Sequence, residues 1–253
     1  EDEEYPGAGD PSNFLLDGKS ATKPQNDLIA QAAALGKPMV VVLEAGSVIE
    51  MPWLAQVPAV VMAWYPGMVG GRAIGDLLFG KKNFGAKLPF TWPTSWDQLP
   101  TFDGGAATTM GYDIGYRYFD RMNLTPLFPF GHGLSYTSFE YSNLQVPCST
   151  VTKNGVIDVS VDVKNSGTVA GDEVVFLFTS YPMTTARRPV KELKGFYRVQ
   201  LDPGVTKRIT IPVRVADLKY WAASGWTVDS GPVLIQVGPN ARSLPLTDTV
   251  TVN

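Results

Sequence analysis

The chain has 253 residues, of which 44% are hydrophobic and 18% are charged. This length and composition argue against wholesale disorder and predict one large domain or two ordinary ones with a sizeable core. The net charge is −3 and no basic run stands out, which argues against nucleic acid and against a membrane as partners. A single cysteine, Cys148, excludes an internal disulfide, and a single histidine, His132, excludes a histidine-rich metal centre.

The first residues suggest a chain that is part of something longer. Residue 1 is a glutamate, and residues 1–10 are acidic and rich in turn-forming residues. The sequence contains no signal peptide and no apolar run long enough to span a bilayer. We therefore expect further polypeptide, and with it further chemistry, outside the sequence given.

Residues 1–100 are predicted to form part of an α/β domain. Two segments, 25–36 and 67–80, place apolar residues at helical spacing and end at a glycine. Two β-branched runs, 39–43 and 57–64, are typical of strands that are buried on both faces. Because strands and helices alternate, we expect a partial three-layer α/β sandwich with about two or three of its strands.

Residues 101–136 are rich in glycine, proline and aromatic residues and are predicted to form a connector. We expect the aromatic residues of 126–136 to pack between two domains. His132 lies between Gly131 and Gly133 and could serve as a catalytic base. We expect instead that it hydrogen-bonds to backbone carbonyl groups at the domain junction.

Residues 137–253 are predicted to form a β-sandwich. Period-two alternation and short apolar runs between turn residues are typical of strands. The predicted strands cover 156–163, 172–178, 205–213, 232–237 and 246–252. About seven such strands in about 115 residues fit a sandwich of immunoglobulin or fibronectin type III size. The predicted fold class is therefore a partial α/β sandwich followed by an all-β sandwich.

Five segments, taken in order, resemble one family of enzymes. They read GGRAIGDLLFGKKNFGAKLPFTWP (70–93), YRYF (116–119), PLFPFGHGLSY (126–136), NSGTVAGDEVVF (165–176) and ELKGFYRVQL (192–201). Together they resemble the C-terminal half of glycoside hydrolase family 3, the β-glucosidase and β-xylosidase group. Any one segment is a weak signal, but five in the same order are specific.

The resemblance implies an N-terminal (β/α)8-like barrel, then an α/β sandwich domain, then a fibronectin type III-like domain. This chain would hold the end of the second domain and the whole of the third, and it would be inactive without the barrel. The implied activity is retaining, exo-acting hydrolysis of β-linked glycosides, oligosaccharides or polysaccharides, with glucose as the expected sugar. No metal or organic cofactor is implied, and a secreted or periplasmic location is expected.

The resemblance also implies where the catalytic acid/base lies. In the family the nucleophile is an aspartate on the barrel, and no segment here resembles its motif. The acid/base is a glutamate from a loop that precedes a Gly-Asp step, which matches Gly9-Asp10 here. Glu3 is therefore the expected acid/base, with Glu4 as a close alternative. Pro11 stands where the family usually has an arginine, and an acidic, solvated terminus is the competing interpretation.

Other candidates have both a functional and a structural interpretation. Glu44 and Glu50 follow a predicted strand, where ligands of α/β sheets often bind, although we expect them to hydrogen-bond within loops. Four aromatic residues could form a sugar-stacking platform but are expected in the core: Trp53, Trp64, Tyr65 and Trp92.

A second function class remains open at this point. The chain could be a non-catalytic module for carbohydrate binding or structural support, or an inactive fragment. The α/β portion decides against the module, because a stand-alone β-sandwich has no reason to carry it.

Overall fold

The computed structural model describes residues 25–100 and 111–253, which divide into two compact units. The described part of the first unit is 25–82 with 92–100, and that of the second is 83–91 with 111–253. The first unit is α/β and the second is mainly β, as the sequence predicts. Among the described residues, no helix combines the length and the apolar character needed to cross a membrane.

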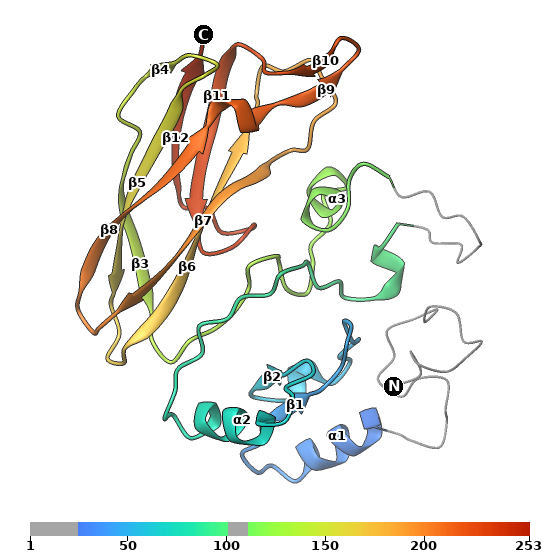
Figure 1. The fold of residues 1–253 in the computed structure, drawn as a ribbon. Coiled ribbons are helices and arrows are strands. Elements are labelled where there is room, and N and C mark those ends of the chain that lie inside the picture. The colour runs from blue at the N-terminus through green and yellow to red at the C-terminus, as the bar shows by residue number, and fades with distance from the viewer. Residues whose placement is uncertain (1–24, 101–110) are drawn as a thin grey trace. The chain divides into compact units, whose positions relative to one another are not determined.

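The first unit is built around two short parallel strands (Figure 1). Its elements are α1 (Gln25–Ala34), β1 (Val41–Leu43), the 3-10 helix η1 (Leu54–Gln56), β2 (Val60–Met62), α2 (Gly70–Leu78) and the 3-10 helix η2 (Trp96–Gln98). Val41 lies opposite Val60 in the parallel ladder. The predicted helices and strands are confirmed, and Gly36 and Gly80 follow the two helices with φ values of 65° and 71°.

The described residues of the first unit form a small core. Its buried apolar residues are Val41, Leu43, Ile49, Met51, Trp53, Val57 and Trp92. Helix α1 buries no residue and α2 buries only Gly70. Most apolar positions that define the two helices in the sequence are therefore half-buried, and Leu28 and Val69 are exposed.

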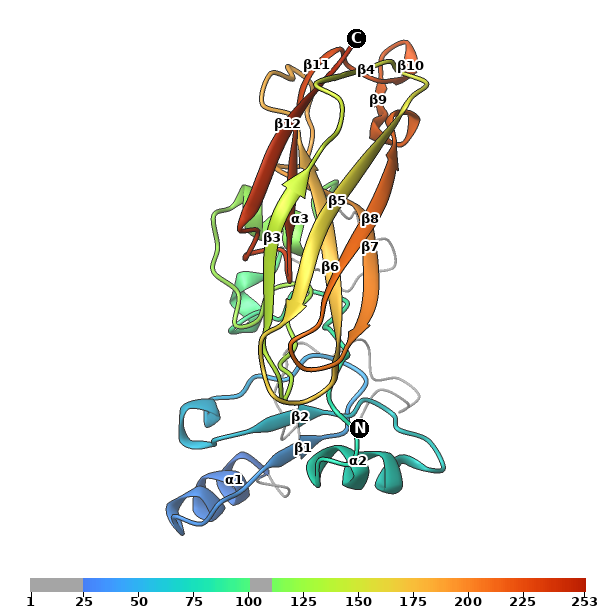
Figure 2. The ribbon, with the colours of Figure 1, turned by 90° about the vertical axis from the view of Figure 1, so that its left-hand side faces the viewer.

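The second unit is a β-sandwich (Figures 1 and 2). Its strands are β3 (Phe139–Gln145), β4 (Thr150–Val151), β5 (Val156–Asn165), β6 (Gly171–Ser180), β7 (Glu192–Leu201), β8 (Thr206–Arg214), β9 (Tyr220–Ala222), β10 (Gly225–Thr227), β11 (Gly231–Gly238) and β12 (Leu246–Val252). One sheet has the order β4-β12-β11-β6-β7 and the other the order β3-β5-β8. The 3-10 helix η3 (Val215–Leu218) leads into a separate hairpin of β9 and β10.

The sandwich core follows from the alternation seen in the sequence. On β5, Ile157, Val159, Val161 and Val163 are all buried while the residues between them are not. They belong to one cluster with buried residues of β6, β8, β11 and β12 from both sheets. Strands β3 and β7 were not among the strands predicted from periodicity. Each lies at the edge of its sheet, where half-exposed residues blur the alternation.

Residues 83–91 belong to the sandwich unit, where Leu88 bonds to the connector. Its amide donates to the His132 carbonyl at 2.7 Å, and its carbonyl accepts from the Gly131 amide at 2.8 Å. The Lys87 ammonium lies 3.1 Å from the Glu173 carboxylate on β6, and Glu173 is buried while Lys87 is partly buried.

The outer face of β6 is covered by aromatic rings of the connector. Phe176 and Phe178 form a second buried cluster against Phe130 and Tyr116, the first residue of α3 (Tyr116–Arg121). The ring of Tyr116 meets that of Phe178 edge to face, with centroids 5.5 Å apart. The connector aromatics are thus part of the sandwich unit's packing.

Candidate functional site

The predicted acid/base glutamates, Glu3 and Glu4, lie outside the described residues. Two other regions of the described chain gather polar side chains where chemistry could occur. One is the edge of the first unit at the carboxyl ends of β1 and β2. The other is a cluster of charges between β7, α3 and the loop that joins β6 to β7.

The edge of the first unit is set by the parallel register. Leu43 pairs with Met62, and the ladder continues with the Ala63 amide donating to the Leu43 carbonyl at 2.8 Å. Glu44 and Trp64 therefore leave the sheet at the same edge, which is where open α/β sheets bind ligands. Trp64 has a positive φ of 55°, an uncommon conformation for an aromatic residue that is found more often at functional sites.

Glu50 belongs to the loop after β1 and has a structural role. Its carboxylate accepts a 2.9 Å hydrogen bond from the Trp96 amide, which confirms the expected loop hydrogen bonding. The same loop is held by the Trp92 indole, which donates to the Ile49 carbonyl, and by the Trp53 indole, which donates to Asn26. Glu44, by contrast, is exposed.

The four aromatic residues expected in the core divide into two pairs. Trp53 and Trp92 are each 2% exposed, and the structure confirms them as core residues. For the other pair the expectation is wrong: Trp64 is half-buried and Tyr65 is exposed. Both follow β2 at the carboxyl edge, beyond the loop that encloses the core tryptophans.

The edge contributes one exposed carboxylate, whereas retaining glycoside hydrolysis needs two carboxyl groups about 5–5.5 Å apart. Within residues 25–100 and 111–253, no three His, Cys, Asp or Glu side chains gather as a metal ion would require. The described edge can therefore line a sugar-binding cleft, but its described residues do not form a complete catalytic pair.

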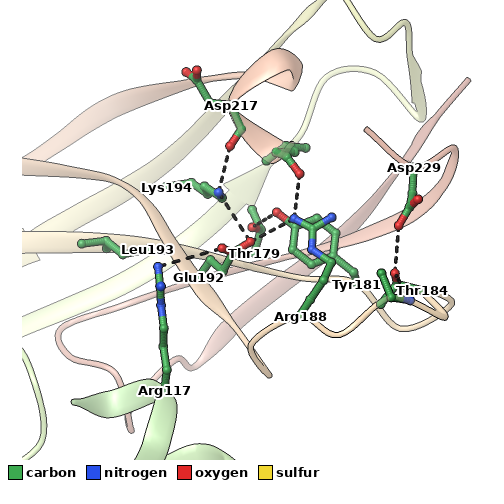
Figure 3. A network of polar contacts seen from close by, with 12 residues as sticks. Arg117, Thr179, Tyr181, Thr184, Arg188, Glu192, Leu193, Lys194, Asp217 and Asp229 are labelled. Carbon is green, nitrogen blue, oxygen red and sulfur yellow. Dashed lines mark hydrogen bonds and ion pairs between the residues drawn. The ribbon is translucent and has the colours of Figure 1, made fainter. Parts of the chain in front are cut away.

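The charged cluster of the second unit centres on Glu192, at the start of β7 (Figure 3). The Arg188 guanidinium donates to its carboxylate at 2.9 Å, and Lys194 and Arg117 lie 3.5 and 3.9 Å away. Arg188 also donates to the Leu218 carbonyl at 2.7 Å. The Arg188 side chain is 2% exposed, so solvent does not reach the cluster from the side of Arg188.

The electrostatics of this cluster indicate a structural role. Burial alone would raise the pKa of Glu192, but Lys194, Arg188 and Arg117 hold that pKa below its ordinary value of 4.5. Burial lowers the pKa of Lys194, and the Glu192 carboxylate opposes that shift. An ionised carboxylate that is already bonded and enclosed neither donates a proton nor contacts a substrate, so Glu192 pins the β6–β7 loop in place.

A second set of ion pairs ties α3 to the same loop. Asp113 pairs with Arg121 and lies 3.8 Å from Arg187, and Asp120 pairs with Lys191 at 2.5 Å. These carboxylates are buried. No sequence pattern predicted this set of ion pairs. Its signal was the charged run from 187 to 194, which is unusual beside an apolar strand.

His132 does not have the surroundings of a catalytic base. Its ring stacks on Phe128 with centroids 4.6 Å apart. Its main-chain carbonyl accepts from the Leu88 amide and its main-chain amide donates to the Pro129 carbonyl, whereas the sequence suggested hydrogen bonds from its side chain. Burial, and then the charge of Lys87, lower the pKa of His132 below its ordinary value of 6.5. The histidine is therefore a neutral packing group in the connector at neutral pH.

The glycines on either side of His132 are required by close packing. Gly131 has a φ of 85°, and a Cβ atom there would lie 2.8 Å from the Phe176 ring. A Cβ atom on Gly133 would collide with the Ala86 carbonyl oxygen. The Gly-His-Gly sequence is therefore explained by tertiary contacts within the sandwich unit.

The fold and the described residues define an α/β unit joined to a fibronectin type III-like sandwich, and two family models match these parts. Residues 2–136 match the Glycosyl hydrolase family 3 C-terminal domain, and residues 173–241 match the Fibronectin type III-like domain. The first match covers more than half of the chain, so the chain belongs to glycosyl hydrolase family 3.

Relatives with known names support the same family assignment. The chain is 40% identical to thermostable beta-glucosidase B of Acetivibrio thermocellus, over 97% of this chain and 34% of that protein. It is 37% identical to beta-glucosidase BoGH3A of Bacteroides ovatus, over 90% of this chain and 32% of that protein. The chain thus spans about a third of the length of the curated relatives it matches.

A solved structure shows the same architecture. The beta-glucosidase of Kluyveromyces marxianus in complex with glucose superimposes with a TM-score of 0.85 at 35% identity. The alignment covers 96% of this chain and 29% of that chain. The resemblance drawn from the five sequence segments is therefore confirmed at the level of family and fold.

Proposed function

We propose that this chain is the C-terminal part of a retaining, exo-acting β-glucosidase that removes terminal β-linked glucose. The observation that carries the proposal is the family match over residues 2–136, together with relatives that are named beta-glucosidases. A β-sandwich that served only as a binding or structural module would have no use for the α/β unit. We further propose that the whole protein is secreted or periplasmic.

The proposed reaction divides its two carboxyl groups between two parts of the enzyme. The acid/base is Glu3, with Glu4 as the alternative, and the nucleophile is an aspartate of an N-terminal barrel. This division is supported by the edge of β1 and β2, where Glu50 is already bonded and Glu44 is the exposed carboxylate. No metal or organic cofactor takes part.

Each step transfers one proton through the acid/base. The aspartate carboxylate attacks the anomeric carbon while Glu3 gives its proton to the departing glycosidic oxygen, which leaves as an alcohol. The Glu3 carboxylate then takes a proton from water, and the water oxygen displaces the aspartate. Two displacements at the same carbon release glucose with retained configuration.

The division of labour is tested by activity with and without the barrel. We expect no hydrolysis of an aryl β-glucoside by this chain alone, and turnover when the barrel polypeptide is present. An aryl α-glucoside serves as the control and should remain intact in both cases. Robust turnover by this chain alone would contradict the placement of the nucleophile on the barrel.

The role of Glu3 is tested in the complete enzyme with Glu3→Ala and the matched variant Glu4→Ala. Glu3→Ala should slow substrates with basic leaving groups by about 10²–10⁴-fold and activated aryl glucosides much less. Azide, which needs no deprotonation, should restore turnover and give a β-glucosyl azide. Rescue of Glu4→Ala alone would move the role to Glu4, and rescue of neither variant would place the acid/base outside residues 1–10.

A further inference from the structure

Two tryptophans are displayed side by side on the hairpin of β9 and β10. Trp221 and Trp226 are direct cross-strand partners, with ring centroids 5.4 Å apart in an edge-to-face arrangement. Their exposed fractions are 69% and 63%. By contrast, Trp53 and Trp92 of the first unit are each 2% exposed. The exposure of Trp221 and Trp226 is therefore unusual for tryptophan.

The opposite face of the hairpin anchors it to the sandwich. Tyr220 pairs with Thr227, so both lie on the face away from the two indoles. The Tyr220 hydroxyl donates to the Asp229 carboxylate at 2.8 Å, and the Thr184 hydroxyl donates to the same carboxylate at 2.8 Å. Figure 3 shows Thr184 and Asp229 joined in this way. The guanidinium of buried Arg188 lies 5.0 Å from the centre of the Tyr220 ring.

Hairpin stability alone does not account for two exposed indoles. A cross-strand pair is stabilised as well by smaller β-branched or aromatic residues, without exposing large apolar rings. The hairpin is also already anchored through Tyr220 and Asp229. Exposed apolar surface on an anchored element is more typical of a binding site.

The scarcity of charged residues next to the indoles favours an uncharged ligand. Residues 219–226 contain one charged side chain, Lys219, and its ammonium lies 5.0 Å from the centre of the Trp226 ring. Residues 219–226 offer no cluster of cations for a nucleic acid or an anionic lipid. They offer instead the exposed indole of Trp221 beside that of Trp226, over whose ring the Lys219 ammonium lies, which suits a neutral ring with an apolar C–H face and hydroxyl groups at its rim.

We propose that Trp221, Trp226 and Lys219 form an accessory binding surface for a β-linked glucan chain, separate from the catalytic edge. Glucose joined by β-linkages presents C–H groups on both ring faces, which stack on indoles, and equatorial hydroxyls, which accept a hydrogen bond from the ammonium. The choice of β-linked glucose rests on the proposed function. Such a surface would hold a polymeric substrate to the enzyme between cleavage events.

The test measures binding of cellopentaose and laminaripentaose to this full chain by titration calorimetry, with α-linked maltopentaose for comparison. We expect saturable binding of at least one β-linked pentasaccharide and weaker or no binding of maltopentaose. Trp221→Ala and Trp226→Ala should each weaken binding about tenfold or more, as expected for an indole at the centre of a contact. Phe196→Ala is the matched control, because Phe196 is an equally exposed aromatic residue on β7, and it should bind as the wild type does.

A second pair of variants separates binding from hairpin folding. Trp221→Phe and Trp226→Phe keep an aromatic cross-strand pair, so they should fold as the wild type by circular dichroism and still weaken binding. Wild-type affinity in all four tryptophan variants, or no saturable binding by the wild type, would overturn the proposal. So would a change from dimer to monomer in the tryptophan variants, which would identify a self-association surface.

This outcome is independent of the hydrolysis test. If the complete enzyme hydrolyses β-glucosides and this chain binds no β-glucan, the accessory surface is rejected while the proposed function stands. If this chain binds cellopentaose through the two tryptophans and the complete enzyme has no β-glucosidase activity, the proposed function is rejected while the binding surface stands.

Discussion

The two units of this chain differ in how far their apolar residues are buried. In the sandwich, the apolar face of every long inner strand is buried against the other sheet, as Val161 and Ile235 illustrate. In the α/β unit, two strands of three residues each accompany two helices in which no residue except Gly70 is fully buried. Both units carry clear amphipathic patterns in the sequence, so a pattern predicts an element without predicting that the element is covered.

The difference should appear as a difference in stability. An eight-stranded sandwich with a contiguous core can stand alone, whereas a two-stranded sheet is marginal without further packing. We therefore expect the cooperative unfolding of this chain to report mainly on the sandwich. Matched substitutions, one in each unit or one at a buried and one at an exposed position, test this difference.

The largest effect is expected from matched phenylalanine substitutions. Phe178 is 0% exposed on β6 and Phe79 is 85% exposed after α2. Phe178→Ala should lower the free energy of unfolding by about 3–5 kcal/mol, because it removes apolar contacts and leaves a cavity. Phe79→Ala should change it by less than about 0.5 kcal/mol. Urea unfolding followed by far-ultraviolet circular dichroism measures both, and equal effects would refute the contrast between the units.

The next effect concerns charges rather than apolar contacts. Arg188→Met removes two hydrogen bonds and leaves Glu192 with weaker partners. It should therefore lower the free energy of unfolding by about 3 kcal/mol, near the lower end of the range for a broken buried ion pair. Arg72→Met is the control, because Arg72 is exposed and lies 3.9 Å from Asp76. Arg72→Met should lower the free energy of unfolding by less than about 0.5 kcal/mol.

A third arginine variant sharpens this result. The Arg188 guanidinium lies 3.2 Å from the centre of the Tyr181 ring. The planar shape of the guanidinium should therefore contribute to stability in addition to its charge. Arg188→Lys keeps the charge and should fall between the wild type and Arg188→Met in the same urea experiment. Wild-type stability of Arg188→Met would show that the cluster does not hold the β6–β7 loop.

The smallest effect is a pH dependence from His132. Its pKa in the folded chain is lowered below 6.5, the value expected in the unfolded chain. As pH falls through 6.5, the unfolded chain takes up a proton first, so the folded state loses stability until pH passes the folded pKa. The contribution is fully present above 6.5. His132→Phe, which keeps a ring on Phe128, should flatten the fall in urea midpoint across this window.

The same prediction can be read directly from one signal. Because the chain has a single histidine, its imidazole resonance needs no assignment among several. The proton spectrum of the folded chain should show a titration midpoint below 6.5. A midpoint at or above 6.5 would contradict the burial of the ring against Phe128 and Lys87.

Local sequence predicted the elements that depend on near neighbours. The spacing of apolar residues located α1 and α2, glycines marked the ends of both helices, and alternation located β5. Five ordered segments also led to the family, because each keeps a local pattern that the fold needs. Glu50 was expected to bond within a loop, and the Trp96 amide supplies that bond.

Sequence patterns therefore located α1, α2 and seven of the strands, and they indicated the two fold classes and the family. The tertiary structure alone decided which side chains pair and which faces are covered. Lys87 meets Glu173 at a separation of 86 positions and Asp120 meets Lys191 at a separation of 71, and no local pattern records such pairings. Whether an apolar face is buried also depends on segments distant in the chain, so Val159 and Val161 of β5 are fully buried while the apolar side chains of α2 are at most half-buried.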